Sequence, residues 1–136
     1  MPILTNYRLF LSHAWHRSEG YLRIIDFLNQ SLYFKYINYS VPEDKAFVGL
    51  NENELKQQIR RQIAPVNAVI ILGGMYVSHS RWIQYEIDVA KEMNKPIIGI
   101  RPWNAERMPL AVTLAADVIV GWNTSSIVNA IKQYAK

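Results

Sequence analysis

The sequence predicts an α/β fold in which a five-stranded parallel sheet lies between two layers of helices. Short β-prone runs alternate along the chain with segments whose apolar residues recur at helical spacing. Residues 68–72 and 96–100 are apolar without alternation, which is typical of strands buried on both faces. Helices between parallel strands require right-handed crossovers, and five such strands favour the flavodoxin-like order 2-1-3-4-5.

The first half of the chain is expected to contain two strands and two helices. Residues 7–12 and the aromatic-rich residues 34–39 are predicted to be strands. Asn51, followed three residues later by Glu54, resembles a capping box and predicts where the second helix starts. The apolar residues at helical spacing are Tyr21, Ile24, Ile25, Leu28 and Leu32, and then Leu55, Ile59, Ile63 and Val66.

The second half is expected to contain three strands and three helices. After the strand at residues 68–72, a polar loop over residues 73–80 leads to a helix from about residue 81 to residue 93. Residues 96–100 and 117–120 are the two remaining strands, and Pro109 between them suits the first position of a short helix. The last helix is marked by Ile127, Val128, Ile131 and Ala135.

Composition narrows the class of protein. The length of 136 residues fits a single domain, residues 1–136, and the absence of cysteine excludes disulfides, thiolate metal sites and a cysteine nucleophile. No signal segment or bilayer-spanning apolar run is present, so we expect a cytoplasmic protein without membrane contact. The net charge of +4 suits an anionic ligand, or simply a solvated surface, and is too small to predict nucleic-acid binding.

The expected strand order also predicts where a ligand binds. Ligands bind beyond the carboxyl ends of the strands, at the switch point between the first and third strands. The loops that start at Ser12 and Gly73 should therefore flank the site. Four tryptophans follow strand ends, and their rings either stack on a base or nicotinamide or simply cover the end of the sheet. These are Trp15, Trp82, Trp103 and Trp122.

Glu86 departs from the polar pattern of its helix. At about 100° per residue it falls inside the apolar arc, one turn after Trp82. An ionised carboxylate that faces a core is costly unless it is paired or lies in a polar cavity. Because the residue is near the predicted helix start, we expect it to be recessed in a crevice at the carboxyl edge of the sheet. The alternative is a structural glutamate paired with an arginine such as Arg8 or Arg101.

Several other chemistries are disfavoured. Ser12-His13 and Leu72-Gly73 stand where a receiver domain needs acidic residues, and no Walker loop or dinucleotide-binding glycine pattern is present. Ser12 and His13 could belong to a hydrolase triad, but no nucleophile elbow accompanies them. No metal site is expected, because no carboxylate pair completes a set with the histidines His13, His16 and His79.

Two motifs resemble those of TIR domains. Residues 7–13, YRLFLSH, look like the first TIR box. Residues 80–86, SRWIQYE, fit the Ser-x-Trp-x-x-x-Glu pattern of NAD-consuming TIR domains, with Ile83 where a cysteine is often found. Residues 82–87 and 95–100 are closer still to the TIR-like family that includes the TIR subunit of Thoeris antiphage systems. The usual second TIR box is missing, and residues 38–43 stand in its place.

The resemblance implies an enzyme that breaks the nicotinamide–ribose bond of NAD+, an NAD+ glycohydrolase or an ADP-ribosyl cyclase. The bond is broken by hydrolysis, by base exchange or by cyclisation, and cyclisation makes a cyclic ADP-ribose-type signal. NAD+ is then the substrate, and no cofactor is implied. Glu86, which the helical projection selects independently, would be catalytic. The resemblance and the predicted site together assign substrate binding to Ser12, His13, Ala14, Trp15, Ser40, Gly73, Ser80 and Trp82.

The resemblance also implies partners. These are other copies of the TIR domain and a signal-activated effector protein that is reached through a nucleotide messenger. The loop over residues 39–50 suits contact with a neighbour, although it could equally pack on its own domain; its apolar residues are Val41, Phe47, Val48 and Leu50. The main alternative to an enzyme is a non-catalytic TIR-like adaptor or nucleotide sensor, in which Glu86 is structural. A receiver-like signalling module is a third, weaker possibility.

Overall fold

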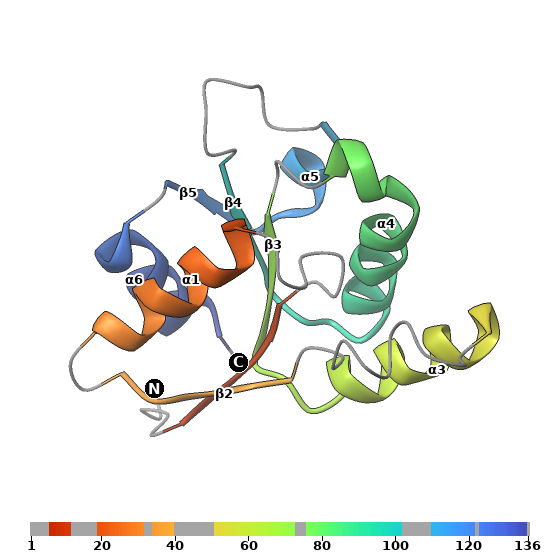
Figure 1. Cartoon of the computed structure of the whole chain (residues 1–136), viewed down its shortest axis with the longest axis horizontal. Coiled ribbons are helices and arrows are strands. Elements are labelled where there is room, and N and C mark those ends of the chain that lie inside the picture. The colour runs from red at the N-terminus through yellow and green to blue at the C-terminus, as the bar shows by residue number, and fades with distance from the viewer. Residues whose placement is uncertain are drawn as a thin grey trace.

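The computed structural model confirms the three-layer α/β fold and the predicted strand order (Figure 1). It describes residues 6–11, 19–31, 34–39, 51–72, 76–101, 110–121 and 123–135, without the side chains of residues 19–22 and 76–81. Neighbouring strands are all parallel, in the order β2-β1-β3-β4-β5. The strands are β1 (Tyr7–Leu11), β2 (Tyr36–Asn38), β3 (Ala68–Leu72), β4 (Ile97–Ile100) and β5 (Val118–Val120).

Helices cover both faces of the sheet (Figure 1). Two helices, α1 (Glu19–Gln30) and α6 (Thr124–Tyr134), pack on one face. The other face is covered by α3 (Glu52–Ile63), α4 (Tyr76–Glu92) and α5 (Leu110–Ala115). Each face therefore has its own hydrophobic core, and β3 lies in the centre between the two.

The unalternating sequence of β3 follows from this position. Ala68, Ile70 and Leu72 pack in the core beneath α1 and α6. Val69 and Ile71 pack in the core beneath α3 and α4. All five β3 side chains are buried, as the run of apolar residues predicted for a strand covered on both faces.

Two polar side chains extend the sheet at its amino edge. Asn67 accepts a hydrogen bond from the Arg8 backbone N–H through Oδ1 at 2.8 Å, and its own N–H donates to the Arg8 carbonyl at 2.7 Å. Asp117 forms the same pair of bonds with Ile97, both at 2.8 Å. Each of the two residues lies just ahead of a strand, β3 or β5, and its side chain satisfies a backbone donor of the neighbouring strand, which helps to fix the register of the pair. Asp117 was predicted to lie within the strand, but it precedes β5.

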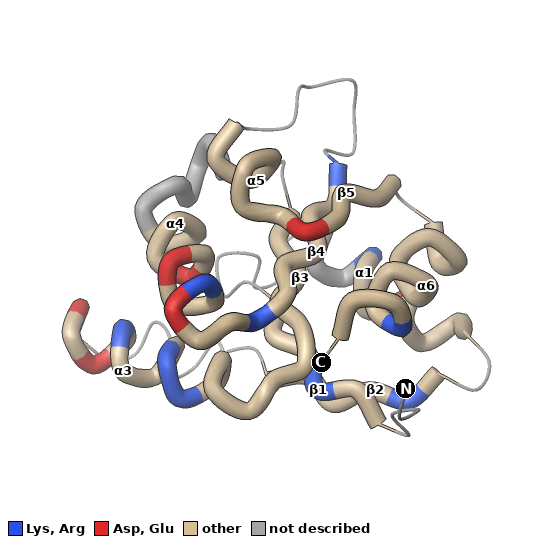
Figure 2. The backbone as a smooth tube through the Cα atoms, turned by 180° about the vertical axis from the view of Figure 1, so that it is seen from behind, with Lys and Arg blue, Asp and Glu red and all other residues tan. Residues whose placement is uncertain are grey.

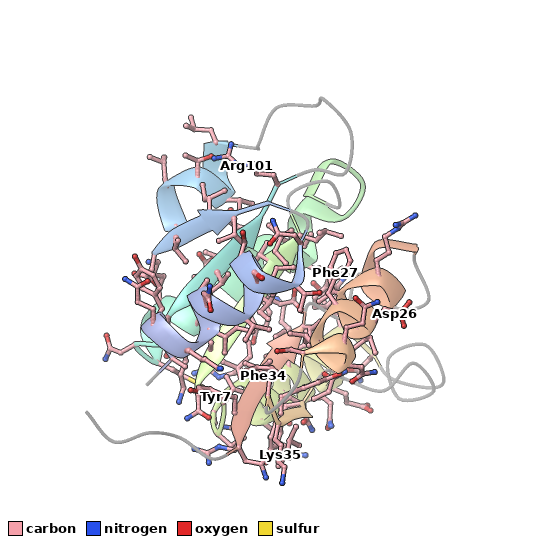
Figure 3. The ribbon with its side chains drawn as sticks, turned by 90° about the vertical axis from the view of Figure 1, so that its left-hand side faces the viewer. Tyr7, Asp26, Phe27, Phe34, Lys35 and Arg101 are labelled. Carbon is pink, nitrogen blue, oxygen red and sulfur yellow. The ribbon has the colours of Figure 1, made fainter. Side chains whose placement is uncertain are left out.

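Stacked rings hold the β1–β2 edge of the sheet against α1 (Figure 3). The centroids of Tyr7 and Phe34 are 5.3 Å apart, and those of Phe34 and Tyr36 are 5.9 Å apart. The Tyr36 hydroxyl donates to Asn29 Oδ1 on α1 at 3.0 Å. The aromatic run predicted as a strand over residues 34–39 thus contains a strand of only three residues, with Phe34 ahead of it in the core.

The helix that follows β2 begins where its sequence predicted. Asn51 is the N-cap of α3, and its Oδ1 accepts from the Glu54 N–H at 2.8 Å. Glu54 completes the cap by accepting from the Asn51 side-chain amide at 2.9 Å. The predicted apolar stripe of this helix is buried throughout, at Leu55, Ile59, Ile63 and Val66.

The prediction of a loop over residues 73–80 is wrong for its second part, because α4 begins at Tyr76. Residues 76–80 contain no glycine or proline, so the helix that was predicted from about residue 81 extends upstream. At its other end, Asn94 adopts a left-handed conformation with φ of 57°. Lys95 N–H then bonds to the Ala90 carbonyl at 2.8 Å, which closes the helix and turns the chain into β4.

No helix in the described part of the chain is both long and apolar enough to cross a bilayer. The remaining boundaries differ from prediction by one or two residues. Pro96 lies outside β4, and its carbonyl accepts from the Val69 N–H at 2.9 Å. The buried residues of α6 include Ile127, Val128 and Ile131, as predicted.

Candidate functional site

Glu86 is fully buried, with none of its surface exposed to solvent. Among the residues that the structure describes, Asn67 is the only other polar or charged residue that is buried. The α4 residues one turn away from Glu86 all pack in the core beneath α3 and α4; they are Trp82, Ile83, Val89 and Ala90. The predicted place of Glu86 inside the apolar arc is therefore confirmed.

The position of Glu86 relative to the start of its helix differs from the prediction. Since α4 begins at Tyr76, Glu86 lies in the middle of the helix, about 15 Å from its first residue at 1.5 Å per residue. It was predicted near the helix start. The cause is the upstream extension of α4, which leaves Glu86 beside the sheet instead of above its edge.

The course of α4 still relates Glu86 to the carboxyl edge of the sheet. The helix follows the carboxyl end of β3 and runs back towards the amino edge, where β4 begins. With 17 residues, α4 spans about 25 Å, whereas the five residues of β3 span about 17 Å. Side chains on a helix lean towards its N-terminus, which for α4 is the direction of the carboxyl edge.

Trp82 is the predicted substrate-binding residue whose side chain the structure describes. It is half-buried, lies one turn before Glu86, and packs against the same core. Its ring meets Tyr85 edge-on, with centroids 6.3 Å apart and an interplanar angle of 88°. Trp82 and Glu86 are four residues apart, so they lie on the same face of α4, one helical turn from each other.

The other predicted binding residues fall where the structure gives no side-chain position. Ser80 lies within α4, but its side chain is not described. Six residues lie outside the described ranges, namely Ser12, His13, Ala14, Trp15, Ser40 and Gly73. The same holds for His16, Trp103, Trp122 and the loop over residues 40–50. Their assembly around Glu86 stays a prediction.

One arginine proposed as a structural partner of Glu86 is engaged elsewhere. Arg8 Nε donates to the Pro65 carbonyl, at the amino edge of the sheet. Arg101 is exposed and follows β4 at the carboxyl edge, where its N–H bonds to the Val120 carbonyl at 2.9 Å (Figure 3). The structural alternative for Glu86 therefore no longer includes Arg8.

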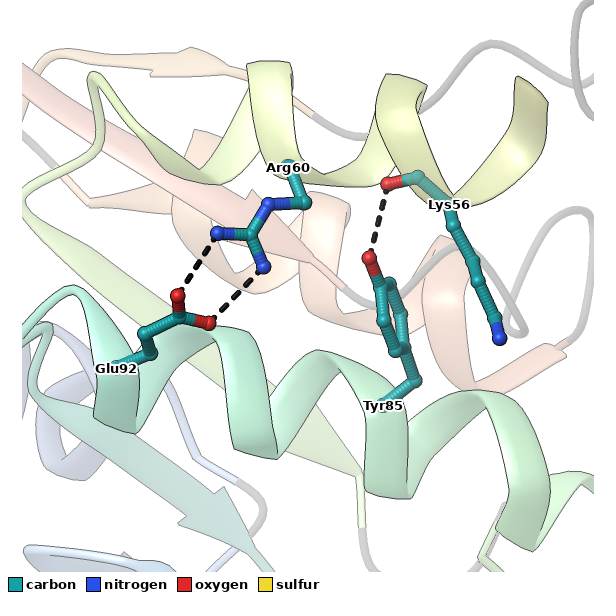
Figure 4. A network of polar contacts seen from close by, with 4 residues as sticks. All are labelled: Lys56, Arg60, Tyr85 and Glu92. Carbon is teal, nitrogen blue, oxygen red and sulfur yellow. Dashed lines mark hydrogen bonds and ion pairs between the residues drawn. The ribbon is translucent and has the colours of Figure 1, made fainter. Parts of the chain in front are cut away.

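Two polar tethers join α3 to α4, the helix that carries Glu86 (Figure 4). Arg60 donates from both terminal nitrogens to the two carboxylate oxygens of Glu92, at 3.0 Å each. The hydroxyl of Tyr85 donates to the Lys56 carbonyl at 3.2 Å, and Lys56 Nζ lies 5.5 Å from the centre of the Tyr85 ring. The sequence pattern singled out neither Tyr85 nor Glu92, because such long-range pairs leave no periodic signal.

The charged tether lies at the solvent-exposed end of α4, where acidic and basic residues stand side by side (Figure 2). Hydrogen bonding to Arg60, followed by its charge, lowers the pKa of Glu92. The bond to Glu92 in turn raises the pKa of Arg60. Both side chains are substantially exposed, so the pair adds little to stability even though its geometry is bidentate.

The amino edge of the sheet has a separate open pocket of about 200 Å³. It lies at the end of the sheet opposite to the predicted ligand edge and is lined by Lys91, Asn94, Lys95, Pro96, Asp117 and Tyr134. No cluster of three or more potential metal-ligating side chains occurs among the residues that the structure describes.

The chain is similar in structure to two solved proteins, and the first of them shares its fold. A CMP N-glycosidase, BcmB, from Clostridium botulinum is 20% identical, with a TM-score of 0.55 over 93% of this chain and 99% of that chain. A 3-dehydroquinate dehydratase-like protein from Bifidobacterium longum is 10% identical, with a TM-score of 0.49 over 96% of this chain and 95% of that one. At these identities the first likeness establishes the fold alone.

Sequence comparison identifies the family. No curated protein matches the chain in sequence. A family description, "Thoeris protein ThsB, TIR-like domain", matches residues 10–107. This range begins within β1, contains β2, β3 and β4, and includes both Trp82 and Glu86. Since the match covers well over half of the chain, the protein belongs to the family of the Thoeris ThsB TIR-like domain.

Proposed function

We propose that this protein is an NAD+-consuming TIR enzyme of Thoeris-type antiphage defence. In this proposal it cleaves the nicotinamide–ribose bond and makes a cyclic ADP-ribose-type signal. The observation that carries the proposal is a fully buried glutamate, Glu86, one turn after Trp82, at the two positions that match the NAD-consuming TIR pattern. Membership of the ThsB family supplies the context of defence.

Glu86 acts by electrostatic stabilisation. In NAD+ the nicotinamide ring is a pyridinium cation, and it departs from the ribose as a neutral molecule, so its departure needs no general acid. The positive charge is left on the ribose, which takes on oxocarbenium character. A carboxylate about 4 Å from that cation stabilises it by about 4 kcal/mol at an effective dielectric constant near 20. A single carboxylate is then sufficient, whereas most glycosidases need two.

Trp82 forms one wall of the substrate pocket in this proposal. Ser12, His13, Ala14 and Trp15 line the pocket from the loop after β1, with Ser40, Gly73 and Ser80 around them. If the pocket holds the adenine against the ribose, an adenine nitrogen attacks C1′ as nicotinamide leaves. Because both reacting groups belong to one bound molecule, this step is effectively unimolecular. The cyclic product then serves as the messenger to an effector protein.

The fold of a known N-glycosidase lends further support. The Clostridium botulinum protein is described as a CMP N-glycosidase, an enzyme that breaks a bond between a base and a ribose. The same α/β fold therefore accommodates N-glycoside cleavage in another protein. This observation also makes CMP the second substrate to test, with cytosine as the base released.

The test is incubation of the purified protein with NAD+ and, separately, with CMP. Chromatography would separate released nicotinamide or cytosine, and mass spectrometry would distinguish ADP-ribose from its cyclic form. We expect nicotinamide and a cyclic product from NAD+, both absent with Glu86→Gln. Cytosine release from CMP alone would reassign the substrate while keeping the N-glycosidase chemistry.

The competing function is that of a non-catalytic adaptor or nucleotide sensor. It predicts nucleotide binding or self-association without release of any base. The decisive condition is a protein concentration high enough for assembly, because the resemblance to TIR domains implies association with other copies of the domain. Stoichiometric NAD+ binding with no turnover in the assembled state would favour the sensor and contradict the enzyme.

A further inference from the structure

We propose that Tyr85 is a positioning residue that fixes the Trp82 ring beside Glu86. The proposal rests on the proposed function for the roles of Trp82 and Glu86, but the contacts that Tyr85 makes are independent of the reaction. Tyr85 belongs to the Ser-x-Trp-x-x-x-Glu segment at one of its variable positions, so the pattern itself assigns it no role. Its role comes from what it contacts.

Tyr85 links Trp82 to a neighbouring helix. Its hydroxyl donates to the Lys56 carbonyl on α3 at 3.2 Å, and its ring meets the Trp82 ring edge-on at 6.3 Å (Figure 4 shows the first contact). Lys56 Nζ lies 5.5 Å from the centre of the same ring. The ring is thus held at its hydroxyl end and in contact with the Lys56 ammonium, while it packs against Trp82.

The burial of Trp82 and Glu86 indicates why Trp82 needs this support. Glu86 is fully buried in the core of its helix face. Trp82 is only half-buried, so core packing restrains its ring less than it restrains Glu86. An edge-on aromatic contact has a preferred geometry, and Tyr85 therefore selects among the orientations open to Trp82.

The second tether between the same two helices provides a matched control. Glu92 lies two turns after Tyr85 on α4 and pairs with Arg60 on α3. Its side chain is 62% exposed and bonds to Arg60. Glu92→Gln weakens the α3–α4 tether without removing a contact to Trp82, so it separates helix attachment from ring positioning.

The kinetic test divides binding from turnover. Trp82 is proposed to contact the substrate in both its ground and transition states, so misplacing its ring raises KM and leaves kcat nearly unchanged. We expect Tyr85→Leu to raise KM for NAD+ by about tenfold, with a smaller increase in Tyr85→Phe, which keeps the ring. Glu92→Gln should leave KM within about twofold of the parent value. A merely structural Tyr85 would instead lower the apparent kcat through loss of folded enzyme.

A spectroscopic test does not depend on activity. The protein is labelled with 5-fluorotryptophan, and the Trp82 resonance is assigned by its loss in Trp82→Phe. We expect this fluorine line to broaden in Tyr85→Leu, because the Trp82 ring then exchanges among several orientations, and to keep its width in Glu92→Gln. Loss of the Tyr85 ring current alone would shift the line without broadening it, so a Trp82 line of unchanged width in a folded Tyr85→Leu protein would overturn the positioning role. A broadened line in a protein without NAD+ turnover would preserve the positioning role and count against the proposed function instead.

Discussion

Replacement of Glu86 by glutamine is the perturbation with the largest expected effect on activity. Glutamine keeps nearly the same shape and volume, so the fully buried position on α4 stays filled. It removes the negative charge that is proposed to stabilise the ribose cation. The side chain can still accept and donate hydrogen bonds, so the change isolates charge from packing.

The magnitude follows from the burial of Glu86. A charge interaction of about 4 kcal/mol, for groups about 4 Å apart at an effective dielectric constant near 20, corresponds to about a thousandfold in rate. The fully buried position argues against the much weaker interaction, about 1 kcal/mol, that applies in bulk water. We therefore expect kcat for nicotinamide release to fall by about three orders of magnitude in Glu86→Gln.

The assay is nicotinamide release measured at saturating NAD+, with circular dichroism and thermal unfolding to establish that the variant is folded. Glu92→Gln is the matched control, because it is the same chemical change on an exposed part of the same helix. Its rate should stay within about twofold of the parent. A folded Glu86→Gln protein that retains more than about a tenth of the parental kcat would refute electrostatic catalysis by Glu86.

Three further predictions concern stability, pH and assembly. Asn67→Ala should lower the free energy of unfolding by about 1–3 kcal/mol, because the Arg8 N–H loses its acceptor at the amino edge; urea unfolding measures this. The small stabilisation by the Arg60–Glu92 pair should be lost as the pH falls below the ordinary carboxyl range towards the lowered pKa of Glu92. Thermal unfolding of the parent and of Glu92→Gln, compared between neutral and acidic pH, measures this loss. Specific activity should rise steeply with protein concentration and lose this dependence in Phe47→Asp, with light scattering reporting the oligomeric state.

Each of these predictions has an outcome that contradicts it. Asn67→Asp retains an acceptor oxygen, so a loss as large as that of Asn67→Ala would argue against the hydrogen bond as the cause. Equal pH dependence in the parent and Glu92→Gln would mean that the Arg60–Glu92 pair contributes nothing measurable. Constant specific activity down to dilutions where only monomer remains would contradict assembly-dependent function.

The sequence was sufficient to predict the fold because burial leaves periodic patterns. The unalternating run at residues 68–72 indicated a strand covered on both faces, and both hydrophobic cores meet at that strand. Asn51 and Glu54 indicated a helix start through a local cap. The start of α4 at Tyr76 was missed, because a polar stretch without glycine or proline is compatible with both loop and helix.

The candidate site was predictable in part for the same reason. A single carboxylate inside an apolar arc is visible in a helical projection, and Glu86 is buried as that projection predicted. The contact of Tyr85 with the Lys56 carbonyl joins residues 29 positions apart and was not predictable from periodicity. The bonds of Asn67 and Asp117 to neighbouring strands depend equally on tertiary structure.

The most direct test of the account is a crystal structure with carba-NAD+, in which a methylene group replaces the oxygen of the nicotinamide ribose ring and prevents cleavage. The measured quantity is the distance from the Glu86 carboxylate to the carbon that bears nicotinamide. The account predicts about 4 Å or less, the separation used to estimate charge stabilisation, with the Trp82 ring against the ligand. Carba-NAD+ bound elsewhere, with Glu86 still covered by core side chains, would contradict a catalytic role for this glutamate.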